Sequence, residues 1–389
     1  MRGRLSIFEN KINKFLRQKQ GIMKNESFNL LIYMNMHNKK LILLFLFFLG
    51  IYSNSYGQFP GGRATFNFLS SPSSARLTGL GGTQISVSDS DINLVGGNPA
   101  VLNQNMTGKL GLNHFFLPGN IQSGNAAYAF TIANNKTWLH LGLHFLQYGE
   151  MPRTDEYFQT TGTFKANENR ISVGVAHSIA DRLQIGSTLS FAQSSLGEFV
   201  SSALVLDAGL FYTDSSKLTT IGIVYRNAGL QLNPYFSGNS KEPLPNDIQI
   251  AISKKLRYLP FRFTLLYNHL NRWNVRYYNP DNESARLIIG EELAEPAQLA
   301  IFVDNLFRHI ILNGELIVGA NENFKLRMAY NHRSRMEFGT VGVGGLNGFS
   351  FGFGLKIKRF SFDFGRSIYH LGGGLTHIGI TTQLKKNIF

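Results

Sequence analysis

Apolar and polar residues alternate along much of the chain from about residue 108 onward. Across 349–357 every second residue is Phe, Leu or Ile, and the residues between them are Ser, Gly or Lys. A period of two places successive side chains on opposite faces of a β-strand. The pattern therefore predicts an all-β fold whose strands have one apolar, aromatic face and one small or charged face.

The alternation divides into fourteen predicted strands. They lie at 108–117, 122–133, 136–147, 168–179, 182–194, 202–213, 217–227, 247–257, 260–270, 310–320, 323–332, 348–358, 360–366 and 375–386. Short connections, such as those at Asp181 and Arg359, take turns with longer ones along the chain. The long connections are predicted at 148–167, 228–246, 271–309 and 333–347, with a short amphipathic helix inside 291–307.

Charged residues on the polar face distinguish between two all-β architectures. Lys, Arg and Glu opposite a continuous Phe and Leu face do not suit the dry core of a soluble sandwich. They suit a barrel whose interior is wet and whose outside meets lipid, and an even number of strands with short and long connections in turn is typical of such barrels. We therefore predict a 14-stranded antiparallel transmembrane β-barrel over 108–389, in the outer membrane of a Gram-negative bacterium, with long extracellular loops at 228–246 and 271–309.

The N-terminal region has the composition of an export signal. Two lysines, Lys39 and Lys40, precede the uninterrupted apolar run 41–49, and small residues follow as far as Gly57. Because a transmembrane helix needs about 20 apolar residues, this run predicts a signal peptide over 36–57. Residues 1–35 are then an upstream extension, with Met34 or Met36 as the start; the alternative is a genuine cytosolic extension of an anchored protein.

Overall charge changes this picture little. The formal charge is +14, but residues 1–57 hold nine Lys or Arg against Glu9 and Glu26, which is half of it. The rest is spread thinly, so nucleic acid is not an expected partner. The chain has no Cys, which excludes disulfides and thiolate chemistry.

Residues 58–107 lack the alternation and are rich in Gly, Ser and Asn. Eight strands already close over a packed interior, so fourteen enclose a wider lumen that something should fill. We predict that 58–107 folds inward as a hatch, with Arg63 and Arg76 paired to acidic lumen residues. Its polar composition does not suggest an apolar pocket.

Motifs for catalysis are missing from the sequence. It contains no Gly-x-Ser-x-Gly, His-Glu-x-x-His or phosphate-binding Gly-rich loop. His140 and His144, four residues apart on a strand, are about 13 Å apart and too distant to share a zinc ion. We therefore predict no catalytic residues, no metal ligands and no cofactor. Arg333 and Arg335 could bind an anionic lipid sugar, although a solvated loop is the simpler interpretation.

Short sequence motifs spread over the whole mature chain resemble those of the PorQ family. This family belongs to the type IX secretion system of Bacteroidetes and lies within the long-chain fatty-acid transporter superfamily. These motifs are Gly61-Gly62-Arg63, Phe68-Leu69, Ser74-Ala75-Arg76, Gly79 to Gly82, Asn98-Pro99-Ala100, Tyr148-Gly149-Glu150, Leu244-Pro245, Lys254-Lys255-Leu256, Pro260-Phe261-Arg262-Phe263, Asp304-Asn305-Leu306-Phe307-Arg308-His309, Tyr330-Asn331-His332-Arg333 and Gly348-Phe349-Ser350-Phe351-Gly352. In this resemblance Asn98, Pro99 and Ala100 match a structural motif of the hatch.

The resemblance implies a non-enzymatic role. It implies an outer-membrane component that docks a PorZ-like surface protein in an attachment complex with a PorU-like sortase and a PorV-like barrel, which joins cargo to anionic lipopolysaccharide. Long outer loops would form the docking surface, so trimming 271–309 should release the PorZ-like partner. Two alternatives stay open: a transporter of hydrophobic compounds, and a barrel enzyme with a Ser–His pair near the lipid face.

Overall fold

The computed structural model describes 64–117, 119, 121–132, 136–236, 238, 240–276, 298–319, 321–337, 345–370 and 373–384. The predicted upstream extension 1–35, the predicted signal peptide 36–57 and Arg63 lie outside the described residues.

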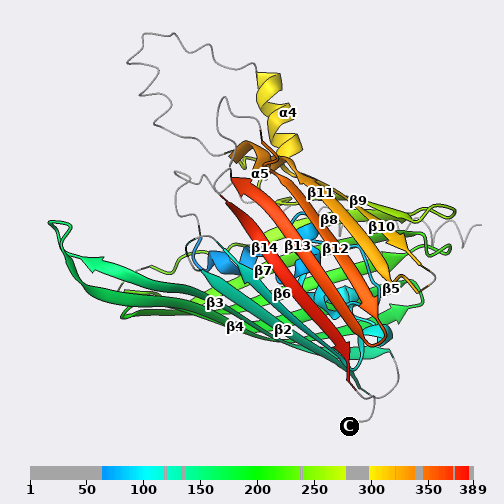
Figure 1. The fold of residues 1–389 in the computed structure, drawn as a ribbon, viewed down its shortest axis with the longest axis horizontal. Coiled ribbons are helices and arrows are strands. Elements are labelled where there is room, and N and C mark those ends of the chain that lie inside the picture. Colours follow the sequence, from blue (N-terminus) through cyan, green and yellow to red (C-terminus); the bar gives the residue numbers. More distant parts are fainter. Residues whose placement is uncertain are drawn as a thin grey trace, which may run out of the picture. The chain divides into compact units, whose positions relative to one another are not determined.

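Fourteen antiparallel strands pair in chain order, and β1 pairs with β14 to close the ring (Figure 1). The strands are β1 Lys109–Phe116, β2 Gln122–Thr131, β3 Thr137–Thr154, β4 Thr160–Ala180, β5 Leu183–Leu196, β6 Phe199–Thr213, β7 Thr219–Asn233, β8 Asp247–Lys255, β9 Phe261–Tyr267, β10 Ile310–Val318, β11 Phe324–Asn331, β12 Phe349–Ile357, β13 Phe360–His370 and β14 Gly373–Gln383. Closure leaves no strand edge unpaired, which membrane-spanning sheets require. The predicted closed, 14-stranded antiparallel β-barrel is confirmed.

Two predicted loops are wrong. The segment 148–167 is mostly strand, because β3 and β4 continue far beyond the neighbouring strands and turn only at 155–159 (Figure 1). The predicted loop 228–246 begins later, since β7 runs to Asn233. The predicted helix of 291–307 is present as α4, Gln298–Arg308, and a second short helix, α5, His332–Glu337, follows β11. The first residues of the predicted helix, 291–297, lie outside the described residues.

The two ends of the barrel differ. At the end where β1 begins and β14 finishes, short turns join the strands, as at 256–260 between β8 and β9. We call this the short-turn end. At the opposite end α4 and α5 follow β9 and β11, and we call it the long-loop end (Figure 1).

Five short helices precede the barrel. They are η1 Asn67–Ser70, α2 Ala75–Gly79, η2 Ile92–Gly96, η3 Pro99–Val101 and η4 Gln104–Met106. Most are single 3-10 turns, which suits a segment poor in regular apolar spacing. Within the described residues, no helix combines the length and the apolar character that a membrane crossing would need.

The outward face of the strands forms an apolar belt. Leu141, Val173, Leu189 and Leu206 lie side by side on β3 to β6 and are 43–52% exposed. Their inward neighbours, such as Thr188, are buried. A continuous apolar outer surface of this extent is stable against lipid and not against water. The structure is therefore that of a transmembrane barrel.

This belt makes a prediction for lipid bilayers. Leu189→Lys should lower the free energy of unfolding by roughly 2–4 kcal/mol, because it places a charge in the hydrocarbon. Reversible urea unfolding in lipid vesicles would measure it. The matched control is Gln193→Lys, on the same face of β5 but nearer its end, where the effect should be small. Equal effects of the two substitutions would contradict a membrane-embedded belt.

Candidate functional site

The N-terminal segment 64–107 occupies the lumen. Helix α2 contacts β12, β13 and β14, whereas η3 contacts β5 and β6 on the other side of the ring. Polar side chains join the segment to the wall, as in the hydrogen bonds of Thr78 with His377 (2.6 Å) and Ser86 with Ser253 (2.7 Å). A segment that contacts inward-facing residues on opposite sides of a closed ring must lie within it.

Asn98, Pro99 and Ala100 form a tight turn against two strands. The Asn98 carboxamide accepts a hydrogen bond from the Ala100 N–H (2.9 Å) and donates to the Ile85 carbonyl (2.8 Å). Asn at the cap followed by Pro in the first helical position is a favoured start of a helical turn. The wall position that faces this turn is a glycine, Gly209. A Cβ there would lie 1.9 Å from the Asn98 side-chain oxygen, so a larger residue would clash. The motif therefore has a structural role in seating the segment.

Apolar packing fills much of the remaining lumen. Leu94 and Leu102 of the segment are fully buried, in a cluster that also contains Trp138 and Phe211 of the wall. The indole N–H of Trp138 donates to Gln104 (3.0 Å). The Ser- and Asn-rich composition of the segment did not indicate this apolar core.

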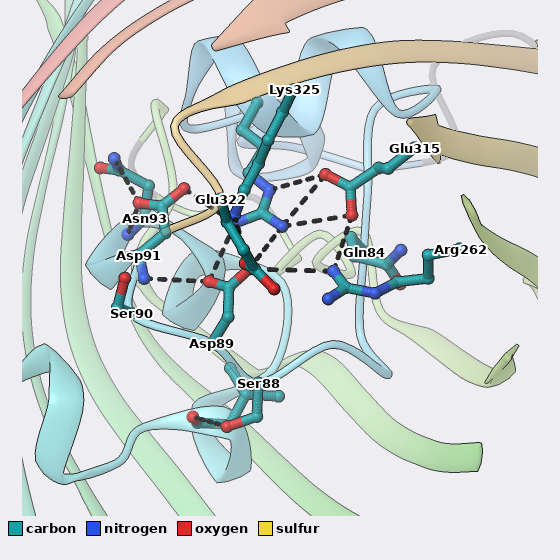
Figure 2. Close-up of polar contacts among 12 residues, drawn as sticks. Gln84, Ser88, Asp89, Ser90, Asp91, Asn93, Arg262, Glu315, Glu322 and Lys325 are labelled. Carbon is teal, nitrogen blue, oxygen red and sulfur yellow. Dashed lines mark hydrogen bonds and ion pairs between the residues drawn. The ribbon is translucent and has the colours of Figure 1, made fainter. Parts of the chain in front are cut away.

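Buried ion pairs fasten the segment to the barrel at its short-turn end (Figure 2). The Arg76 guanidinium is 1% exposed and binds both carboxylate oxygens of Asp89 at 2.7 and 3.0 Å. It also binds Glu315 of β10 at 3.1 Å and Asp91 at 3.2 Å. Because Asp89 and Asp91 belong to the segment and Glu315 to the wall, Arg76 joins the two. The predicted pairing of Arg76 with an acidic lumen residue is confirmed.

The network continues along the wall. Glu315 also accepts from Arg262 of β9 (2.8 Å) and Arg327 of β11 (3.2 Å), and Arg327 pairs with Asp363 of β13 (2.6 Å). Lys325 reaches Asp89 at 3.3 Å. Four cationic groups thus meet four carboxylates, and a buried network is favourable only when its charges are balanced in this way. We call these eight residues the Arg76 network: Arg76, Asp89, Asp91, Arg262, Glu315, Lys325, Arg327 and Asp363.

Pairing keeps these groups charged inside the protein. Burial disfavours the charged form of Arg76, but Asp89 and Glu315 outweigh it and hold the pKa of the guanidinium well above its usual range. Burial also disfavours the charge of Asp89, yet Arg76 and Lys325 hold the pKa of that carboxyl well below its usual range. The ion pairs therefore persist at neutral pH.

The long-loop end carries a second ordered site around α4. His309, directly after α4, is fully buried, stacks on Tyr267 and contacts the backbone oxygens of Asn268 (2.8 Å) and Trp273 (3.0 Å). Asp304 of α4 pairs with Arg308 (2.8 Å) and Arg276 (3.2 Å). These contacts fix α4 to the rim of the barrel.

Two histidines of β3 lie in the lumen. His140 and His144 are both buried, and His144 lies 3.0 Å from the Ser123 hydroxyl. This Ser–His pair packs against Phe68 and Phe115 inside the barrel rather than at the lipid face. Within the described part of the chain, no cluster of His, Asp and Glu is arranged to hold a metal ion.

The closed ring of strands and the segment inside it define the class of the protein. It is a transmembrane β-barrel of the outer-membrane type whose lumen is occupied by its own N-terminal segment. No family model and no curated protein matches the chain.

Similar solved structures include hydrocarbon channels. The CymD monoaromatic hydrocarbon channel has a TM-score of 0.48 and 13% identity over 81% of this chain and 99% of that one. The Pseudomonas putida toluene transporter TodX has a TM-score of 0.45 and 12% identity over 80% and 96%. A Pseudomonas aeruginosa FadL homologue has a TM-score of 0.45 and 10% identity over 81% and 98%.

The Arg76 network gives a stability prediction. Arg76→Met should lower the free energy of unfolding by about 3–5 kcal/mol, because it leaves Asp89 and Glu315 buried without their shared partner. Urea unfolding followed by tryptophan fluorescence would measure it, since Trp138 contacts the segment. Arg359→Met, at an exposed turn, is the control and should change little. An unaltered midpoint for Arg76→Met would show that the network does not hold the segment.

Acid should loosen the same contact. Asp89 has a lowered pKa in the folded protein, so its charge stabilises the fold above the ordinary value of about 3.9. That contribution is lost as the pH falls below this value. Hydrogen exchange, corrected for the intrinsic rate, should show faster exchange of 64–107 at pH 3 than at pH 7 while the strands stay protected. Unchanged protection of the segment at pH 3 would contradict this.

Proposed function

We propose that this barrel is a non-enzymatic outer-membrane anchor for a cell-surface assembly, the role that its resemblance to the PorQ family of the type IX secretion system implies. The observation that carries the proposal is the apolar face that α4 leaves exposed at the long-loop end. The proposed occupant of this face is a PorZ-like surface protein, with PorU-like and PorV-like partners in the same complex.

Helix α4 leaves several large apolar side chains exposed on one side. Leu299 is 72% exposed, and Phe302, Val303 and Phe307 are also exposed. Their spacing places them along one side of the helix, opposite the buried Asn305. Clustered apolar side chains on an outer surface mark a site for protein partners, and aromatic residues are enriched in the centres of such interfaces.

This face is presented on a rigid base. Phe302 packs against Trp273 with ring centroids 5.0 Å apart, and Phe307 meets the His332 ring edge-on at 5.9 Å. The buried His309 and the Asp304 ion pairs hold the helix from below. Because a preorganised surface loses little entropy on binding, this arrangement suits stable docking.

Two of the sequence motifs that carry the family resemblance meet at this rim. Asp304 to His309 form the end of α4 and the residue after it, and Tyr330 to Arg333 lie beside them, where the Tyr330 hydroxyl contacts His332 at 2.9 Å. A second group of motifs, around Arg76 and Arg262, lies in the Arg76 network. Some of the motifs thus lie at the rim and others in the contact between the N-terminal segment and the wall, which supports an anchor with a fixed interior.

Docking is tested by removing the apolar face. The triple variant Leu299→Ser, Phe302→Ser and Phe307→Ser should still insert but lose at least about tenfold of its surface partner. Gentle-detergent purification from the native outer membrane, followed by mass spectrometry, would measure the partner. The control is Tyr258→Ser with Leu259→Ser, which removes exposed apolar groups at the short-turn end. Undiminished co-purification with the triple variant would defeat the α4 assignment.

Transport of hydrophobic compounds is the second candidate, since the similar barrels named above are described as hydrocarbon channels and transporters. One feature favours it: a cavity of about 800 Å³ lies between the N-terminal segment and the long-loop end. Its lining includes Arg226, Asp247 and Arg333, which does not match a hydrocarbon. Loss of uptake of a long-chain lipid or aromatic hydrocarbon on deletion, with no surface protein co-purifying, would favour transport over anchoring.

A further inference from the structure

Charge is distributed unevenly inside this barrel. The Arg76 network at the short-turn end is balanced, whereas the cavity toward the long-loop end is not. That cavity, of about 800 Å³, is lined by four arginines against two carboxylates. These charged residues are Arg226, Arg272, Arg276, Arg333, Asp247 and Glu337.

Arg226 is an arginine of this cavity that makes no direct ion pair among the described residues. Its side chain, on β7, is only 9% exposed. Within the described part of the chain it makes no hydrogen bond or ion pair, and it lines both this cavity and a smaller one of about 60 Å³ beyond it. The carboxylates of Asp207 and Asp247 act on it only through space. A buried guanidinium without a directly bound acid is costly, so its position favours a negative group in the cavity.

The nearest carboxylates are already engaged elsewhere. Asp207 pairs with Arg170 at 2.6 Å and accepts from the Asn227 N–H at 2.6 Å. Asp247 accepts from the His269 N–H at 2.7 Å and from Gln249 at 2.6 Å. Neither lies within ion-pair distance of Arg226. Both acids near Arg226 therefore bind other donors.

The other arginines line the walls of the same cavity. Arg333 pairs with Glu337 at 2.8 Å and contacts His269, and Arg276 pairs with Asp304 at 3.2 Å. Both of these ion pairs are partly exposed, with side chains 19–36% exposed. Their guanidinium groups can therefore add a second contact to an anion that Arg226 holds, as bidentate recognition of carboxylate or phosphate requires.

We propose that this cavity binds the oxyanion of a polar small molecule, a phosphorylated or carboxylated sugar, with Arg226 as its principal contact. The volume falls in the range of small-molecule sites. Much of the uncharged lining is hydrogen-bonding, for example Thr83, Asn227, Gln249 and Ser334, which suits hydroxyl groups rather than a hydrocarbon. Asn67, also in the lining, is exposed, so a ligand can approach from solvent. The site does not depend on the proposed docking role.

Calorimetry on the full chain in detergent tests this with glucose 6-phosphate, glucuronate and glucose as probes. Both acidic sugars should bind and neutral glucose should not. Arg226→Gln should weaken binding about tenfold or more, the value of a lost charge-assisted contact, and Arg226→Lys should restore part of it. Arg257→Gln, at an exposed turn, should bind as the parent chain does.

Stability measurements separate binding from folding. Because Arg226 makes no hydrogen bond or ion pair with the described residues, Arg226→Gln should change the free energy of unfolding little in the absence of ligand, whereas an acidic sugar should stabilise only the parent chain. The same sugar chemistry could come from a lipid headgroup. An anionic glycolipid that co-purifies with the parent chain and not with Arg226→Gln would identify that source. No binding of either acidic sugar together with no co-purifying anionic lipid, or equal binding by Arg226→Gln, would overturn the proposal.

Discussion

The pairing of Arg76 with Glu315 is the contact on which the interior of this barrel depends. Fourteen strands enclose a lumen too wide for wall side chains alone, and the chain fills it with its own segment 64–107. A segment built from single helical turns has little stability by itself, so its conformation must be imposed by the wall. Arg76 supplies that link, because one guanidinium binds acids of the segment and of β10 together.

The wall is shaped to receive the segment. Inward glycines lie where the segment's backbone approaches most closely: a Cβ on Gly222 would meet the Ile85 oxygen at 2.1 Å, and one on Gly365 the Ala75 oxygen at 2.0 Å. Glycine inside a strand often marks such a close approach. The glycine-rich composition thus reflects the contents of the lumen as well as the turns. Removal of the segment would expose the glycine-lined wall and take away one of the three arginines that bind Glu315.

Strand positions were predictable from sequence because burial of one face imposes the period of two. The strand segments wrongly predicted as loops are those that lack a buried face. In β3 and β4 the alternation fades across 151–163, where nearly all residues are exposed on both faces. Without a buried face, no pattern is imposed, and the sequence there resembles a loop. Arg76 could be selected because it is one of only two cations, with Arg63, in a segment expected to face inward. Its partner Glu315 could not, since 239 residues separate them.

Arg226 escaped sequence analysis for a related reason. An arginine at an inward position of a predicted barrel strand is ordinary, and only the arrangement of its neighbours makes it exceptional. A bulge at Asn227, with its left-handed φ of 53°, shifts the pairing of β6 and β7 around Asp207. The Asp207 carboxylate then accepts the Asn227 N–H and pairs with Arg170, so it acts on Arg226 only through space. Such a reassignment depends on one backbone dihedral and has no signature in composition or periodicity.

The two proposed sites at the long-loop end share an ion pair. Arg276 lines the cavity, and Asp304, its partner at 3.2 Å, lies on α4 beneath the apolar face. An anion that draws the Arg276 guanidinium into the cavity would weaken the ion pair between Arg276 and Asp304. A protein docked on α4 would favour either the state in which Arg276 binds Asp304 or the state in which it binds the anion. Coupling of this kind is reciprocal in free energy. If the cavity binds an anion and α4 binds a partner, as proposed, the two events are linked through the Arg276–Asp304 ion pair.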